Sequence, residues 1–235
     1  MDRCIKLTMS VFLITGSLAC QAADMESTEE EQVVVEGAMA EEELRVVEGG
    51  GELSGWEGRT DGDAPFDDVR VLAIDDGWQI DNGPAVALWQ DDLTAMGSYT
   101  LSGTFHQVSS KGHPHGTGLV FGGTDLDGPG QAYTYFMVMG DGTYLVKNRD
   151  GDETSWVLPS GAWTADDAVN ADDENGLYTN DLAVQVGETE TVFMVNGTEV
   201  FRVANTEIHT DGTYGVRVNH NLTIEVRDLM VDAGM

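Results

Sequence analysis

Cysteine is nearly absent from this chain of 235 residues. The only two cysteines, Cys4 and Cys20, lie within the first 20 positions. The rest of the chain contains no cysteine, so it cannot form a disulfide of its own. The folded part must therefore be stabilised by packing and hydrogen bonding, even in an oxidising compartment.

Basic residues are also scarce. The chain has 11 Lys and Arg against 42 Asp and Glu, which gives a formal charge of −31. Nucleic acids and anionic membrane surfaces bind proteins through clustered positive charge. The composition therefore predicts no nucleic-acid partner, and contact with a membrane only through a lipid anchor. An acidic, lysine-poor surface favours solubility and is also expected in salty surroundings.

Long hydrophobic runs are missing as well. The apolar segment at residues 11–14 follows Arg3 and Lys6 and precedes small residues, a pattern typical of a secretory signal peptide over residues 1–23. It is too short to span a bilayer as a mature helix. The chain is therefore expected to be exported, with a periplasmic, outer-membrane-anchored or extracellular location.

Two processing routes fit this segment. Ordinary cleavage would follow Ala22 or Ala23, whereas the lipoprotein route would cleave before Cys20 and attach lipid to its thiol. The run from Ser17 to Cys20 resembles a bacterial lipoprotein signal, although Ser17 stands where that signal usually has Leu. Both routes remain open.

Residues 24–54 contain ten glutamates and no aromatic residue. High like charge and few bulky apolar side chains favour an extended, flexible linker. The short apolar runs at residues 33–35 and 44–47 offer an alternative, a transient helix or an edge strand. With Cys20 lipidated, such a linker would hold the remaining domain, residues 55–235, away from the membrane.

Helical periodicity is nearly absent after residue 54, residues 165–171 being the exception. Short β-type runs bounded by Gly, Asp, Asn or Pro predict strands. They are residues 69–74, 78–80, 85–89, 99–105, 118–121, 133–139 and 144–147, the runs of 181–226, and residues 222–231. No internal repeat is visible. Many short strands at near-regular spacing predict an all-β domain of two packed antiparallel sheets, a sandwich or jelly roll.

The clearest turn signal lies within residues 181–226, which have the pattern of consecutive antiparallel strands. Asn196-Gly197 predicts a type I′ hairpin, because both residues tolerate positive φ angles. Gly140-Asp141-Gly142 and Gly187-Glu188 predict further tight links. Strands that are neighbours in sequence are therefore expected to be neighbours in the sheets.

A succession of loose motifs resembles the concanavalin A-like lectin/glucanase superfamily, in particular its laminin-G-like and 3-keto-disaccharide hydrolase (DUF1080) bacterial domains. They are GTGLVFGGTDLDGPGQAYTYFMVMGDGTYLVKNRDGD, TNDLAVQVG, VFMVNGTEV and DGTYGVRVNHNLTIEVRDL, within residues 55 to 232. The resemblance implies a curved jelly roll that is often used for sugar binding and sometimes for glycoside cleavage. It implies no particular catalytic residue.

A catalytic carboxylate pair has no clear sequence signal. Glucanases of this fold carry E-x-D-x-x-E along one strand, and no such run occurs here; Glu225-Val226-Arg227-Asp228 has the wrong spacing. Carboxylates in turns favour a solvated or turn-capping role.

Aromatic residues supply the main binding hypothesis. Tyr133 and Tyr135 share one face of a strand by alternation, and that face either joins the core or forms a curved surface with exposed aromatics. Trp156 and Trp163 flank the loop signal Pro159-Ser160-Gly161 and are expected to be exposed. Trp56, Trp78 and Trp89 lie beside strand patterns and are expected to be buried.

Histidines give a weaker signal. His106, His113 and His115 gather around a Gly- and Pro-containing loop, but their spacing is not a known zinc pattern, so they are interpreted as loop residues bordering a groove. Alternation places His220 in the core with Val218 and Leu222. It places Arg217, Asn219 and Asn221 on the opposite side, as either a sugar-binding polar row or an ordinary solvated strand face.

Acidic clusters make calcium the candidate metal. Asp125 and Asp127, Asp150 and Asp152, and residues 172–175 offer hard oxygen ligands, but none has the spacing of an EF-hand loop. Asp125 and Asp127 are the candidate ligands of a structural calcium. No cofactor is expected to be required.

The sequence thus favours an exported, non-catalytic module that binds extracellular glycan on a concave sheet face. A glycoside hydrolase and a structural or adhesive surface protein are the alternatives. Aromatic rings and hydrogen-bonding groups would contact the ligand. The predicted binding residues are Tyr133, Tyr135, Arg149, Trp156, Trp163, Asn219, His113 and His115.

The processing routes can be separated by mass spectrometry of the mature protein from a bacterial host. We expect either a lipid-modified Cys20 or an unmodified N-terminus at Ala23 or Asp24. A mature protein that retains Met1 would contradict the signal assignment.

Overall fold

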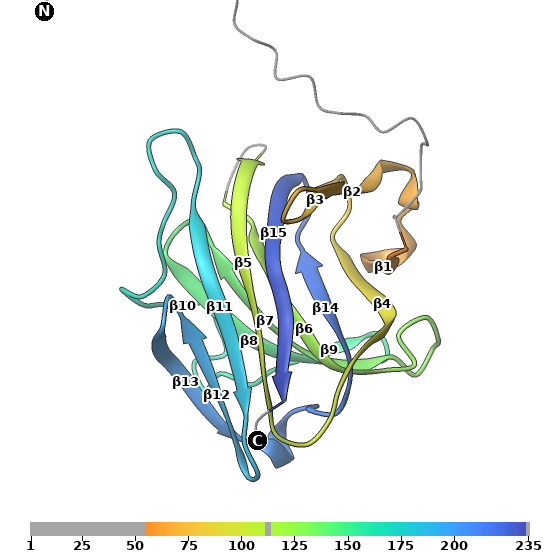
Figure 1. Ribbon diagram of the computed structural model, residues 1–235, viewed down its shortest axis with the longest axis vertical. Helices are drawn as coiled ribbons and strands as arrows, with labels where there is room; N and C mark the ends of the chain where they lie inside the picture. Colours follow the sequence, from red (N-terminus) through yellow and green to blue (C-terminus); the bar gives the residue numbers. More distant parts are fainter. Residues whose placement is uncertain (1–54, 111–113, 234–235) are drawn as a thin grey trace, which may run out of the picture. The chain divides into compact units, whose positions relative to one another are not determined.

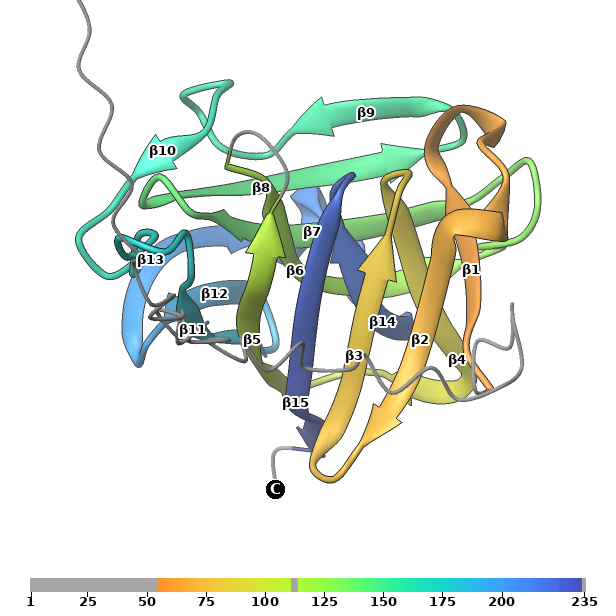
Figure 2. The same cartoon turned by 90° about the horizontal axis from the view of Figure 1, so that it is seen from above.

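The computed structural model describes residues 55–110 and 114–233. The predicted signal peptide and acidic linker, with Cys20, lie outside these ranges, as does His113. Two antiparallel sheets are packed face to face, with β5, β15, β3 and β2 in one layer and β6, β7 and β8 in the other (Figures 1 and 2). The all-β, two-sheet sandwich predicted from the strand pattern is confirmed.

One sheet has eight strands, in the order β1-β4-β14-β6-β7-β8-β10 with β9 paired to β8. Its strands are β1 (Glu57–Thr60), β4 (Val86–Ala95), β6 (Gly116–Thr124), β7 (Ala132–Met139), β8 (Thr143–Asp150), β9 (Glu153–Trp156), β10 (Thr164–Ala165) and β14 (Gly212–Val218).

The other sheet has seven strands, in the order β13-β12-β11-β5-β15-β3-β2. Its strands are β2 (Val69–Ile74), β3 (Gly77–Asn82), β5 (Tyr99–Ser110), β11 (Thr179–Val186), β12 (Glu190–Val195), β13 (Thr198–Ala204) and β15 (Leu222–Ala233).

Helices are minimal in the described ranges. They are the 3-10 turns η1 (Asp61–Asp63), η2 (Phe66–Asp68) and η3 (Asn205–Glu207). Within the same ranges, no helix has the length and apolar character needed to cross a membrane. The helical signal at residues 165–171 is wrong, since only Ala165 of this segment lies in a regular element.

The predicted hairpins form where the turn residues indicated them. Asn196 and Gly197 have φ angles of 49° and 77°. These are the positive values that a type I′ turn between β12 and β13 requires. Gly142, with φ of 80°, joins β7 to β8. Strand pairs joined by tight turns are therefore adjacent in their sheets.

The expectation that residues 181–226 stay together is only partly right. Strands β11, β12 and β13 do pair in sequence order, but β14 crosses to the eight-stranded sheet and lies between β4 and β6. Strand β15 then returns to lie between β5 and β3. Alternation indicates which side chains are buried, but it does not indicate which strand becomes the partner.

Aromatic rings join the two sheets in the core. Phe136 of β7 and Phe193 of β12 have ring centroids 5.2 Å apart, and Phe121 lies 6.1 Å from Phe193. Phe193 also contacts Phe201 across the β12–β13 hairpin, with ring centroids 5.8 Å apart.

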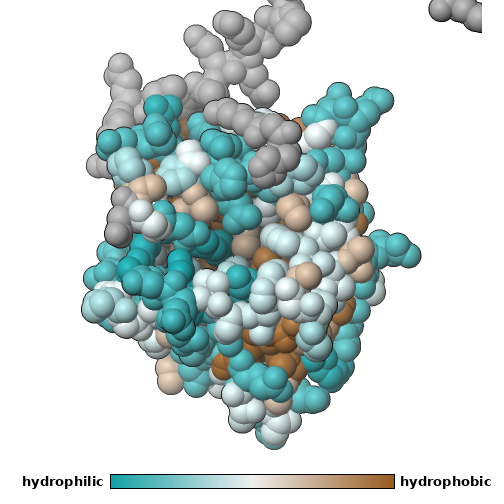
Figure 3. Space-filling model, turned by 180° about the vertical axis from the view of Figure 1, so that it is seen from behind, coloured by the Kyte–Doolittle hydropathy of each residue, from teal (hydrophilic) through white to brown (hydrophobic). Residues whose placement is uncertain are grey.

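The surface seen in Figure 3 is mostly hydrophilic, with an apolar area in its lower half.

Phe193 is therefore the residue on which we expect core stability to depend most. We expect Phe193→Ala to lower the free energy of unfolding by about 3–5 kcal/mol, because the lost contacts and the cavity both add to the cost. Urea denaturation followed by tryptophan fluorescence measures this change.

The control for this experiment is Met96→Ala, at a side chain that is 75% exposed. Substitutions at exposed positions rarely change the free energy of unfolding by more than about 0.5 kcal/mol, so we expect a value within that limit. Similar values for both variants would contradict this account of the core.

Candidate functional site

The outer face of the eight-stranded sheet brings together most of the predicted binding residues. Tyr135 of β7 is paired with Lys147 of β8, which is paired with Trp156 of β9. Tyr133 is paired with Arg149 in the same way. Because Phe136, which follows Tyr135 in the strand, points into the core, the tyrosines and the residues paired with them point outward.

The two tyrosines lie next to each other but are not exposed. Their ring centroids are 5.8 Å apart, and both side chains are buried. The guanidinium of Arg217, from β14, covers the ring of Tyr135 at 5.2 Å. The hypothesis that this face carries exposed tyrosines is therefore wrong, and the rings support charged groups above them.

An aspartate joins two arginines from different strands. Asp61, at the start of η1, accepts a hydrogen bond from Arg149 at 2.9 Å through Oδ1 and another from Arg217 through Oδ2. The side chain of Arg217 is only 7% exposed, whereas that of Asp61 is 41% exposed. We call the group made by Asp61, Tyr133, Tyr135, Lys147, Arg149 and Arg217 the Tyr–Arg cluster.

The local sequence explains why Asp61 reaches this position. Strand β1 pairs with β4 through Thr60, and the N–H of Asp61 then donates to the carbonyl of Ala85. Gly62 follows with φ of 65°. Glycine adopts this left-handed conformation without a steric penalty. The chain thus turns at the sheet edge and leaves the Asp61 carboxylate over the arginines.

Lys147 and Trp156 extend the cluster toward solvent. The Lys147 ammonium lies 4.8 Å from the centre of the Trp156 ring, a cation–π contact. Burial, together with repulsion from Arg217 and Arg149, lowers the pKa of Lys147. Trp156, the last residue of β9, is 38% exposed, as predicted. Beside the Tyr–Arg cluster it offers the one large aromatic surface that a ligand can reach within the described structure.

Trp163 lies on the same sheet face, where its ring covers part of the sheet surface. A side chain at Gly116 would bring its Cβ within 2.6 Å of the Trp163 ring, and Met137 lies beside the same position. Trp163 is half-buried, so the prediction of an exposed platform is wrong for this residue. The loop after β9 folds back over the sheet because it pairs again with β8 through Thr164.

Two other predicted residues lie away from the cluster. Asn219 lies in the turn between β14 and β15, where its carbonyl accepts a hydrogen bond from Asn82 Nδ2 at 2.7 Å. His115 is buried just before β6, and its ring centroid lies 4.2 Å from that of His220. His220 is exposed, which contradicts its predicted core position.

The same turn explains this correction. The chain crosses from one sheet to the other between Val218 and Leu222, and Asn221 takes a positive φ of 58° there. Period-two alternation holds only within a continuous strand. Arg217 lies before the turn and keeps its outward direction, whereas Asn219 and His220 do not follow the pattern.

The calcium candidates lie in a hollow of about 370 Å³ formed by β1, β4 and the loop after β6. This hollow is lined by Glu57, Trp89, Asp91, Asp125, Leu126, Asp127 and Thr213. The Asp125 carboxylate accepts a hydrogen bond from the Gly130 N–H at 2.8 Å, so it stabilises the turn that follows β6. Across residues 55–110 and 114–233, no group of three or more His, Cys, Asp or Glu side chains is arranged to hold a metal.

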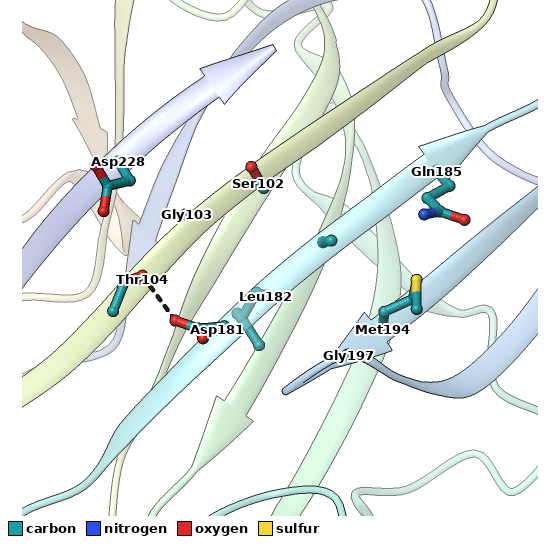
Figure 4. A pocket seen from close by; sticks show the side chains of 10 residues that line it. Ser102, Gly103, Thr104, Asp181, Leu182, Gln185, Met194, Gly197 and Asp228 are labelled. Atoms are coloured by element: carbon teal, nitrogen blue, oxygen red, sulfur yellow. Dashed lines mark hydrogen bonds between the residues drawn. The ribbon is translucent and has the colours of Figure 1, made fainter. Parts of the chain in front are cut away.

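A second hollow, also of about 370 Å³, lies on the outer face of the seven-stranded sheet (Figure 4). It spans β5, β11 and β12, and Thr104 donates a hydrogen bond to Asp181 at 2.7 Å along its floor. Its lining contains Ser102, Gln185, Met194 and Asp228 but no aromatic ring. It therefore lacks the combination of ring and cation found on the other sheet.

Sequence reasoning found part of the Tyr–Arg cluster and missed the rest. Arg149 and the tyrosines were predicted, and Arg217 was considered as part of a polar row. Lys147 was missed, although its two-residue spacing from Arg149 places both on one face. Asp61 has no such signal, because it lies in a turn far from β8 and β14 in sequence.

No family model matches the chain, and no curated protein matches its sequence. Among solved structures it is similar to the carbohydrate-binding module CBM66 from Bacillus subtilis, with a TM-score of 0.55, 11% identity, and coverage of 77% of this chain and 98% of that one. It is also similar to a Bacillus subtilis protein of unknown function with a galectin-like fold, with a TM-score of 0.52, 12% identity, and coverage of 76% and 89%. These similarities show that the fold is a galectin-like β-sandwich.

The Asp61 ion pairs predict a measurable contribution to stability. We expect Asp61→Ala to lower the free energy of unfolding by about 2–4 kcal/mol, because it leaves the buried Arg217 without its carboxylate partner. Urea denaturation measures this change.

The matched control is Asp67→Ala, at an exposed residue of the neighbouring η2 turn. We expect its free energy of unfolding to stay within about 0.5 kcal/mol of the wild-type value, as for most surface substitutions. An equally small effect at Asp61 would mean that the ion pairs do not hold the cluster together.

Proposed function

We propose that this protein binds carbohydrate on the outer face of its eight-stranded sheet, at the Tyr–Arg cluster and Trp156. The observation that supports this most is the exposed Trp156 ring directly beside a set of fixed charged groups. A sugar ring presents an apolar face and a rim of hydroxyls. An indole surface next to oriented donors and acceptors is complementary to both features.

The charged groups are held in place before any ligand arrives. Asp61 accepts a hydrogen bond from both Arg149 and Arg217, and the guanidinium of Arg217 also packs on the Tyr135 ring. Fixed donors lose little side-chain entropy on binding, which favours affinity. The similarity in fold to a carbohydrate-binding module supports the proposal without identifying a ligand.

Glycoside cleavage of the 3-keto-disaccharide hydrolase type is the alternative that the sequence resemblance raised. It needs two carboxyl groups across the scissile bond, one of them as a general acid. Among the described residues, one side-chain carboxylate contacts Arg149 and Arg217, that of Asp61. This arrangement favours binding over cleavage.

A purely structural or adhesive role is a weaker alternative for the same face. Such a role needs no prearranged cluster of cations over aromatic rings. A buried arginine is costly to maintain unless it is paired, and this cost favours a use in recognition.

We further propose that the protein acts outside the cytoplasm, on the sequence evidence of a signal peptide.

Binding can be tested by probing a glycan array with the full chain and titrating the best ligand by calorimetry. We expect Trp156→Ala to weaken binding by about tenfold, since the loss of one stacking contact of about 1.4 kcal/mol corresponds to that factor. The proposed contacts involve no metal, so binding should persist when calcium is chelated.

Met230→Ala is the matched control, because Met230 is 54% exposed on the other sheet. It should leave the affinity unchanged. If Met230→Ala weakened binding while Trp156→Ala did not, the assignment of the binding face would be refuted.

A further inference from the structure

Positive charge is concentrated on one face of this acidic protein. The ranges 55–110 and 114–233 contain seven Lys and Arg residues. Of these, Lys147, Arg149 and Arg217 belong to the Tyr–Arg cluster, and Arg59 approaches its edge through Asp152, at 3.9 Å. By contrast, Arg202 pairs with Glu199, and Arg227 pairs with Glu225. The cluster is therefore a local cationic site in a chain whose formal charge is −31.

The cluster has more donors than its own carboxylate satisfies. Asp61 receives one hydrogen bond from each arginine. Arg217 Nη1 and Arg149 Nε are buried and have no hydrogen-bond partner among the described residues. Unsatisfied donors of this kind are rare in proteins because their desolvation is not repaid. They are donors that the acceptor groups of a ligand in the position of Asp61 can satisfy.

Lys147 adds a third positive charge to the cluster. Its pKa is lowered by burial and by the repulsion of Arg217 and Arg149, so three cations lie close together around one aspartate. Such a group of cations attracts anions. Guanidinium groups also match the planar geometry of a carboxylate, which can accept two hydrogen bonds from them.

We propose that the ligand is an acidic glycan, whose uronate carboxylate binds Arg149 and Arg217 and takes the place of Asp61. This inference rests on the proposed carbohydrate-binding function and names the ligand class. The Asp61 carboxylate shows that the two arginines can donate hydrogen bonds to a carboxylate. The Trp156 ring lies beside Lys147 and would receive the sugar ring that carries the carboxylate.

Asp61 is placed where it can be displaced. It follows β1, a four-residue edge strand that pairs only with β4, and its side chain is 41% exposed. Segments at sheet edges open at lower free energy than core strands. The tyrosines and arginines, by contrast, belong to the inner strands β7 and β14 and to β8, which pairs on both sides. The strands that carry the receiving groups thus stay in place when the aspartate leaves.

The test compares oligosaccharides of galacturonate, glucuronate and mannuronate with the neutral parent sugars, by calorimetry on the full chain. We expect at least one uronate to bind about tenfold or more tightly than its neutral parent. Asp61→Asn should raise uronate affinity about tenfold, because it removes the competing charge and keeps the side-chain shape. Asp67→Asn, at an exposed residue of η2, is the control and should have no effect.

A second variant keeps the test decisive if Asp61→Asn folds poorly. Arg149→Gln should abolish the preference for uronate over the neutral parent sugar, because it removes a guanidinium that pairs with the carboxylate. Neutral sugars that bind as tightly as uronates in the wild-type protein, with Arg149→Gln unchanged, would overturn this inference and leave the proposed function standing. Absence of binding to every uronate and every neutral glycan would overturn both.

Discussion

The buried charge of Arg217 determines the arrangement of side chains on the outer face of the eight-stranded sheet more than any other group does. A guanidinium that is almost fully buried needs a counter-charge, because its desolvation is not repaid by apolar neighbours. Asp61 supplies that charge from a turn 156 residues away in sequence. The ion pair therefore ties the N-terminal edge of the eight-stranded sheet to its centre. The tyrosine rings of β7 fill the space beneath, so that cations and rings form one layer above the sheet.

The fold makes this layer possible. Strand β14 crosses from its neighbours in sequence to lie between β4 and β6, and this crossing places Arg217 within reach of β7 and β8. Phenylalanines on the inner face hold the sheets together from the other side. The inner face of these strands is thus apolar, and their outer face is aromatic and charged. One set of strands serves both purposes because successive side chains point to opposite sides.

The sequence predicted local features well and long-range ones poorly. The strands, the Asn196-Gly197 hairpin and the shared face of Tyr133 and Tyr135 follow from short-range rules. The partner of β14, the burial of the tyrosines and the position of Asp61 depend on contacts between distant segments, and no local pattern indicates these. Asn219 and His220 were misplaced because the alternation was extended through a turn. The signal peptide, Cys20 and the linker lie outside the described structure and stay predictions.

The central claim is that ligands bind at Arg149 and Arg217 rather than elsewhere on the sandwich. It can be tested most directly by following the arginine Nε–Hε and backbone amide signals in NMR spectra while the best-binding glycan is added. The account predicts that the signals of Arg149, Arg217 and the Trp156 indole shift, while the amides of Ser102 and Gln185 in the other hollow stay in place. Shifts confined to Ser102 and Gln185, with both arginines unchanged, would contradict it.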